Sequence, residues 1–319
     1  MPVSALRRLA PAVLMLLTVP LGGCGGGGGD GATHREPVVT STPTVLRTQD
    51  LRFPLSAYDR SEADQEQLGL AQQMLISRCM ARYGFTFRAP SGLGGAPHGQ
   101  AGARRYGVSD AQTAARYGYA PPPRPRAAGR PPSQPELSES GMLALHGAAD
   151  LRPEDVPKSQ QEAERRPGDV KVNGRAIPIG GCLRESYLKL YAPTPDSVDL
   201  LFVFELTAEA ETRSREDSRV RAAFGTWAAC MKESGFSVSN PAEVPEQLGL
   251  DEAELSSPRA VTAAKADVAC KQRVNLVGVT YAVESAYQRQ LIDEHAETLE
   301  LVRKQGDERL RLAASLVGE

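Results

Sequence analysis

A seven-residue motif that occurs twice constrains the fold of this chain more than any other feature. Residues 79–85 read Cys-Met-Ala-Arg-Tyr-Gly-Phe, and residues 230–236 read Cys-Met-Lys-Glu-Ser-Gly-Phe. Apolar residues at helical spacing precede both copies, and Gly84 and Gly235 stand where helices commonly end in a left-handed conformation. We therefore expect each copy to end a helix, with the phenylalanine folded back onto the last turn.

The cysteines limit how these helices can be joined. Of the five cysteines, Cys24 lies near the N-terminus and belongs to the signal described below, which leaves Cys79, Cys182, Cys230 and Cys270. An even number of cysteines outside the cytoplasm favours disulfides, and four allow three pairings. One further cysteine follows each copy of the motif, which favours Cys79–Cys182 and Cys230–Cys270; the other two pairings stay open. The chain has no Cys-x-x-Cys, the spacing typical of thioredoxin-type and zinc sites.

The N-terminus has the pattern of an export signal. Within residues 1–23, Arg7 and Arg8 precede an apolar stretch, residues 9–21, which is shorter than the roughly 20 residues that span a bilayer. Leu-Gly-Gly-Cys at 21–24 resembles the site at which lipoprotein signal peptidase cuts. We expect Cys24 to become a lipid-modified N-terminus that holds the protein at the outer face of the cell membrane.

Composition divides the rest of the chain. Residues 24–54 are rich in Gly, Thr and Pro and are expected to form a disordered tether. Residues 55–192 are expected to form a first helical unit, with a flexible Pro/Gly-rich insertion at about 88–168, and residues 193–319 a second. The predicted fold class is therefore mainly α, with two disulfide-stapled helical units and extensive disordered segments.

The second unit is expected to end in a long helix. Ser257 is a good N-cap, Pro258 suits the first helical position, and no proline follows. Gly278 and Gly306 are the expected places for a bend or break.

Shorter local signals predict three further features. Residues 170–177 alternate around Asn173-Gly174, which is typical of a two-residue β-hairpin and predicts one small β element. Asp110 favours a short helix that ends at Gly118, and Ser61 with Asp64 resembles a capping pair.

Tyrosine and arginine recur together between the first two cysteines. The triplet Arg-Tyr-Gly occurs three times, at 82–84, 105–107 and 116–118. Such clusters can form a stacking surface for a glycan or a peptide. The alternative, which the local pattern favours, is a helix-stop device with a packing aromatic. The candidate binding residues are Arg105, Tyr106, Arg116, Tyr117 and Tyr119.

Signals for catalysis and cofactors are weak. The four histidines have no partners at metal-ligand spacing, and no phosphate loop, dinucleotide fingerprint or Gly-x-Ser-x-Gly occurs, so we expect no metal and no cofactor. A net charge of −2 argues against a nucleic-acid partner. Ser186 and Lys189 form a Ser-x-x-Lys pattern, as in penicillin-recognising enzymes, but the companion motifs of that family are absent.

Three segments carry a family resemblance. Trp-Ala-Ala-Cys-Met at 227–231, Ala-Asp-Val-Ala-Cys-Lys at 266–271 and Glu-Ser-Ala-Tyr-Gln at 284–288 resemble a group of cysteine-containing secreted lipoproteins of high-G+C Gram-positive (actinobacterial) cell envelopes. The resemblance covers most of residues 55–316 and implies a helical, envelope-located protein. No activity is established for the group, so no catalytic residue is carried over.

These features lead to three hypotheses of function. The first is a non-enzymatic accessory or binding subunit of a cell-envelope system, held to the membrane by its lipid and facing an envelope protein or peptidoglycan. The alternative is a glycan- or peptide-binding lipoprotein that uses the Tyr/Arg segments. The third, an envelope hydrolase, has only the Ser-x-x-Lys pattern in its favour.

Overall fold

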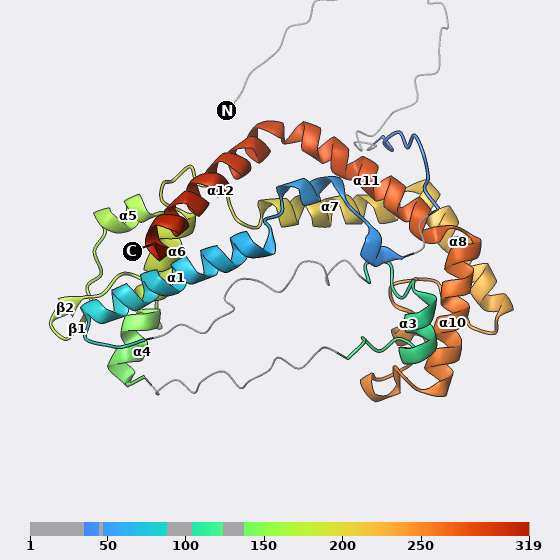
Figure 1. The fold of residues 1–319 in the computed structure, drawn as a ribbon, viewed down its shortest axis with the longest axis horizontal. Helices are drawn as coiled ribbons and strands as arrows, with labels where there is room; N and C mark the ends of the chain where they lie inside the picture. The colour runs from blue at the N-terminus through green and yellow to red at the C-terminus, as the bar shows by residue number, and fades with distance from the viewer. Residues whose placement is uncertain (1–34, 45–46, 88–103, 124–136, 319) are drawn as a thin grey trace, which may run out of the picture. The chain divides into compact units, whose positions relative to one another are not determined.

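The two copies of the cysteine motif end two helices, α1 (Glu62–Arg82) and α8 (Ser218–Glu233), in the computed structural model (Figure 1). The φ angles of Gly84 and Gly235 are +84° and +90°, in the left-handed region. The amide of the phenylalanine after each glycine donates to the carbonyl five residues earlier, at 3.2 and 2.9 Å. These are the hydrogen bonds of a Schellman helix end, and they confirm the prediction.

The structure describes residues 35–44, 47–87, 104–123 and 137–318. Its described part is mainly helical, with one antiparallel hairpin, as predicted, and all the packing below lies within the unit Pro37–Glu319. The other α-helices are α3 (Ala111–Tyr117), α4 (Glu139–His146), α5 (Gln160–Arg165), α6 (Gly181–Tyr191), α7 (Phe202–Glu216), α9 (Val244–Gln247), α10 (Pro258–Arg273), α11 (Leu276–Glu294) and α12 (Ala296–Val317). Short 3₁₀ helices span Thr48–Asp50, Pro54–Tyr58, Pro153–Asp155 and Glu252–Glu254.

The hairpin forms where the Asn-Gly signal predicts it. Strands β1 (Lys171–Val172) and β2 (Arg175–Ala176) pair antiparallel. Both turn residues have positive φ, +49° at Asn173 and +78° at Gly174, as the favoured two-residue hairpin turn requires.

Each disulfide joins two helices beside a buried core. Cys79–Cys182 links α1 to α6, and Cys230–Cys270 links α8 to α10; these are the pairs that the repeat favours. Around the first bridge the buried side chains include Ile76 and Met80. Around the second they include Trp227 and Met231. The cores therefore form where the motif ends each helix.

The two helical units predicted from composition do not pack separately. Helix α12 lies along α1, and α3 packs against α10 (Figure 1). The core around Cys230–Cys270 takes Ala114 and Tyr119 from the predicted insertion. Helix α3 confirms the short helix predicted between Asp110 and Gly118. The other described residues of 104–123 and 137–168 are also folded, which corrects the expectation of a flexible insertion there, because distant helices bury apolar side chains of both ranges. Residues 88–103 and 124–136 lie outside the described residues.

Part of the predicted tether is also folded. Thr48 is buried, and its amide donates to Ser109 Oγ at 3.0 Å. Leu51 is buried as well, in the same core as Trp227. The expectation of disorder up to residue 54 is therefore wrong for residues 47–54, since this segment gains apolar and hydrogen-bonding partners from far along the chain. Residues 24–34 and 45–46, including Cys24, lie outside the described part.

The predicted long C-terminal helix is broken twice, but not at its glycines. It ends at Arg273, restarts after Asn275, whose φ is +49°, and breaks again at His295. Gly278 and Gly306 instead lie inside α11 and α12, where a Cβ would collide with the Pro43 carbonyl and with the Arg60 side chain. The two glycines therefore allow close approach of the N-terminal segment rather than a bend. No helix in the described ranges is both long enough and apolar enough to cross a bilayer.

Candidate binding groove

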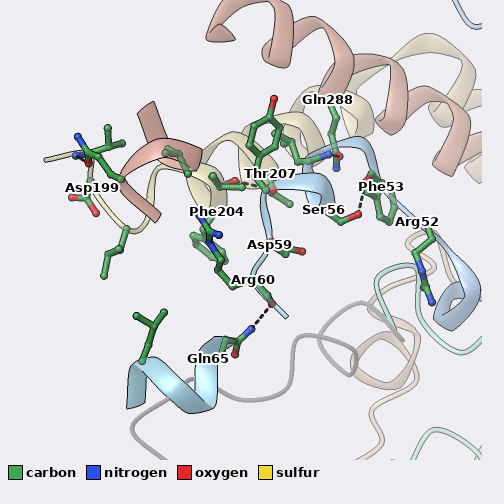
Figure 2. A pocket seen from close by; sticks show the side chains of 18 of the residues that line it. Arg52, Phe53, Ser56, Asp59, Arg60, Gln65, Asp199, Phe204, Thr207 and Gln288 are labelled. Atoms are coloured by element: carbon green, nitrogen blue, oxygen red, sulfur yellow. Dashed lines mark hydrogen bonds between the residues drawn. The ribbon is translucent and has the colours of Figure 1, made fainter. Parts of the chain in front are cut away.

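A groove with a volume of about 780 Å³ lies among several parts of the fold (Figure 2). Its walls are mainly residues 48–60, the start of α7 with the loop before it, and the middle of α12; Arg105 and side chains of α1, α6 and α11 complete the lining. This volume falls in the range of about 300–1,000 Å³ that is usual for ligand sites. The groove is the candidate functional site.

The wall formed by residues 48–60 is fixed to the C-terminal helices. The amide of Leu55 donates to Gln288 Oε1 at 3.0 Å, and Tyr281 Oη donates to the Arg52 carbonyl at 2.6 Å. Arg60 Nη1 donates to Asp307 at 2.9 Å. Because these contacts join residues more than 200 positions apart, the groove exists only in the folded chain.

The start of α7 presents apolar side chains to the solvent. Phe204 is 68% exposed and Leu200 is 40% exposed, and both line the groove. Leu201, between them in the chain, is exposed too. Phe204 is out of phase with the buried face of α7, which carries Leu206 and Ala210. Grouped exposed apolar residues of this kind often mark an interaction site.

Arg309 brings a positive charge to the groove. Its guanidinium lies over the ring of Tyr191, 5.2 Å from the centroid. Burial lowers the pKa of Arg309, and the nearby positive charge of Arg60 acts in the same direction. Within the described part of the chain, no carboxylate forms an ion pair with Arg309. The groove thus holds a half-buried cation that has no counter-ion among the residues the structure describes.

Arg105 also lines the groove, but its charge is already paired. Its Nη2 lies 2.5 Å from Glu284 Oε1 and 3.3 Å from Glu211 Oε2. Tyr106 Oη donates to Glu284 Oε2 at 2.5 Å. Burial raises the pKa of Glu284, while the hydrogen bonds from Arg105 and Tyr106 act in the opposite direction. Arg105 is therefore held by its neighbours and is poorly suited to bind an external anion.

The candidate residues of the Arg-Tyr-Gly segments do not form one surface. Tyr106 and Tyr119 are buried in the core around Cys230–Cys270, and burial raises the pKa of both. Tyr117 is half-buried, with Arg116 over its ring at 5.2 Å. Of the five, only Arg105 lines the groove. Because apolar side chains cover Tyr106 and Tyr119, and Glu284 accepts a hydrogen bond from Tyr106, the alternative of a stacking surface does not hold for these two tyrosines.

A second buried charged cluster lies outside the groove. Lys271 Nζ lies 3.0 Å from Asp267 Oδ2 and donates to the Val108 carbonyl at 2.9 Å. Trp227 Nε1 donates to Asp267 Oδ1 at 2.9 Å. Burial raises the pKa of Asp267 and lowers that of Lys271, while the attraction within the pair opposes both shifts. The cluster joins the segment before α3 to α8 and α10 and is structural.

The two side chains of the Ser-x-x-Lys pattern bond to other groups of the protein. Ser186 is buried and its Oγ donates to the Leu183 carbonyl at 2.8 Å, whereas Lys189 pairs with Glu185. No group of three His, Cys, Asp or Glu side chains in these ranges could hold a metal ion.

Comparison with known proteins found no family model, no curated protein and no solved structure that matches the chain. Sequence reasoning missed Arg60, Phe204 and Arg309; of these, only Phe204 had a sequence signal, its position off the apolar face of its helix.

Proposed function

We propose that this chain is a lipid-anchored, extracytoplasmic binding subunit of a cell-envelope system, without enzymatic activity. The observation that carries the proposal is the groove, in which exposed Phe204 and half-buried Arg309 both face a space that a partner could fill. Two disulfides support an oxidising location outside the cytoplasm. The described lining of the groove contains neither His nor Cys, which favours binding over catalysis.

The partner is a protein segment that packs against Phe204. An aromatic side chain at the centre of a contact commonly contributes a large share of the binding free energy. In the free protein the Phe204 side chain leaves apolar surface in contact with water, which costs a free energy of about 25 cal/mol per Å². Covering it with a partner stabilises the complex without any change in this fold.

Photo-crosslinking in cells tests this proposal. With p-benzoylphenylalanine in place of Phe204 in the full chain, we expect a reproducible adduct with one envelope protein, identified by mass spectrometry. The matched control replaces Met142, which is 45% exposed on α4 and does not line the groove. If position 204 gives no adduct, or the same adducts as position 142, the proposed function is wrong.

The anchor has its own test. Cys24→Ser removes the thiol that would carry the lipid, and we expect the protein to move from the membrane fraction to the soluble fraction, because two or three acyl chains account for stable anchoring. Thr33→Ser, a similar change in the same segment, should leave the protein with the membranes. A Cys24→Ser protein that stays with membranes after cell breakage would contradict the lipid anchor.

A further inference from the structure

The charges that line the groove are unequal in number and in how they are paired. Four arginines and two aspartates line it. One aspartate, Asp199, already accepts from the Leu201 amide at 2.8 Å, where α7 begins. Among the arginines, Arg105 has two glutamate partners, and Arg60 has Asp307. With these pairs formed, Arg309 remains a half-buried cation without a carboxylate partner in the described part of the groove.

An anion at Arg309 would remove an unfavourable arrangement. A cation that loses water and gains no counter-ion is costly, and a second cation nearby adds to that cost. Arg309 is half-buried against Tyr191, with Arg60 near enough to lower its pKa. The planar guanidinium suits a carboxylate, which it can bind through two parallel hydrogen bonds.

From this charge pattern and the exposed Phe204, we propose that the groove binds an acidic segment of a partner polypeptide, with a carboxylate at Arg309 and an apolar side chain against Phe204. The inference rests on the proposed function and names the chemistry of the partner. Charge complementarity and apolar contact would then act within one groove.

The lining favours a polypeptide over a lipid chain. Besides apolar side chains, the lining contains the half-buried guanidinium of Arg309, which has no carboxylate partner among the described residues. An acyl chain packed against this group would remove its water without supplying a hydrogen-bond acceptor. A peptide backbone instead carries a donor and an acceptor at almost every residue.

Selection from a random heptapeptide phage library tests the inference, with the full-length protein in detergent micelles as the target. We expect wild type to select peptides enriched in Asp or Glu together with Leu or Phe. Arg309→Gln should lose the acidic enrichment, and Arg309→Lys, which keeps the charge, should retain part of it. The matched control is Arg303→Gln, because the Arg303 side chain lies on the same helix, is 64% exposed and does not line the groove.

Binding constants then test the contact directly. The best acidic peptide should bind Arg309→Gln about tenfold more weakly than wild type, the loss typical of one charge-assisted hydrogen bond. Its Asp→Asn or Glu→Gln version should bind wild type about tenfold more weakly, with no further loss on Arg309→Gln. Equal melting curves for the variants show that the loss concerns the contact and not the fold.

Several results would overturn the inference. The first is that wild type selects peptides without acidic enrichment. The second is that Arg303→Gln loses as much acidic enrichment and peptide affinity as Arg309→Gln. The third is that phosphatidylglycerol vesicles, which themselves bind through Arg309, displace the selected peptides. The proposed function fails separately: an adduct at position 204 with a segment that has no acidic residue refutes only this inference, whereas the absence of any adduct refutes the proposed function.

Discussion

Asp267→Asn is expected to lower the free energy of unfolding by about 3–5 kcal/mol, the usual cost of removing one partner from a buried ion pair. The Lys271 side chain is only 1% exposed, and Asp267 is its sole carboxylate partner among the described residues. The substitution leaves the buried ammonium group without a counter-charge and with neutral acceptors only, which are the carbonyls of Val108 and Pro241 and the oxygen of the new side-chain amide. Denaturant unfolding followed by the fluorescence of Trp227, the single tryptophan and a fully buried one, measures the change.

Two variants separate the ion pair from other effects of this substitution. Asp307→Asn removes an exposed carboxylate that pairs with Arg60 at 2.9 Å, and it should cost less than about 1 kcal/mol. The double variant Asp267→Asn, Lys271→Met no longer has the uncompensated charge, so it should recover at least about 1 kcal/mol relative to Asp267→Asn. If the double variant is less stable than Asp267→Asn by the full effect of Lys271→Met alone, the two side chains are not coupled.

Loss of the Cys79–Cys182 disulfide, by alanine at both positions, should lower the free energy of unfolding by about 5 kcal/mol. The bridge spans 103 positions, so its removal frees a long loop in the unfolded chain. The Cys230–Cys270 bridge spans 40 positions, and the same loop-entropy argument gives about 4 kcal/mol for its removal. Both losses are measured by the same tryptophan-monitored unfolding under non-reducing conditions.

The order of the two effects is the sharper test. If chain entropy dominates, removal of the longer bridge costs more, although the shorter bridge lies beside Trp227 in its core. A larger loss for the Cys230–Cys270 variant would mean that local packing or strain outweighs loop entropy. A reduced wild-type protein should lose stability similar to that of a variant without both bridges, which controls for the alanine substitutions themselves.

Features that depend on neighbouring residues could be predicted from the sequence. The capping box at Ser61 and Asp64, the hairpin turn at Asn173 and the helix end at Gly84 all use hydrogen bonds within a few positions. Their geometry follows from backbone sterics and short side chains, and distant packing does not change it. The fold class was predictable for the same reason.

Features that depend on distant residues could not be predicted in this way. Arg-Tyr-Gly reads alike at each occurrence, yet Tyr106 is buried because Glu284, 178 positions away, accepts its hydrogen bond. Gly278 is a helix breaker by local propensity, but it lies inside α11, where the Pro43 carbonyl occupies the space that a Cβ would need. Local patterns contain no information on which segment will cover a helix face.

The repeated motif determined that two helices end at Gly84 and Gly235, and with the cysteine count it favoured the pairing that the structure contains. Only the tertiary structure decided that the predicted tether and insertion are partly folded, and that residues 48–60 meet α7 and α12 in a groove. Helix ends are determined by hydrogen bonds between near neighbours. A groove is determined by which apolar and charged side chains remain uncovered once distant segments have packed, and no local pattern specifies that.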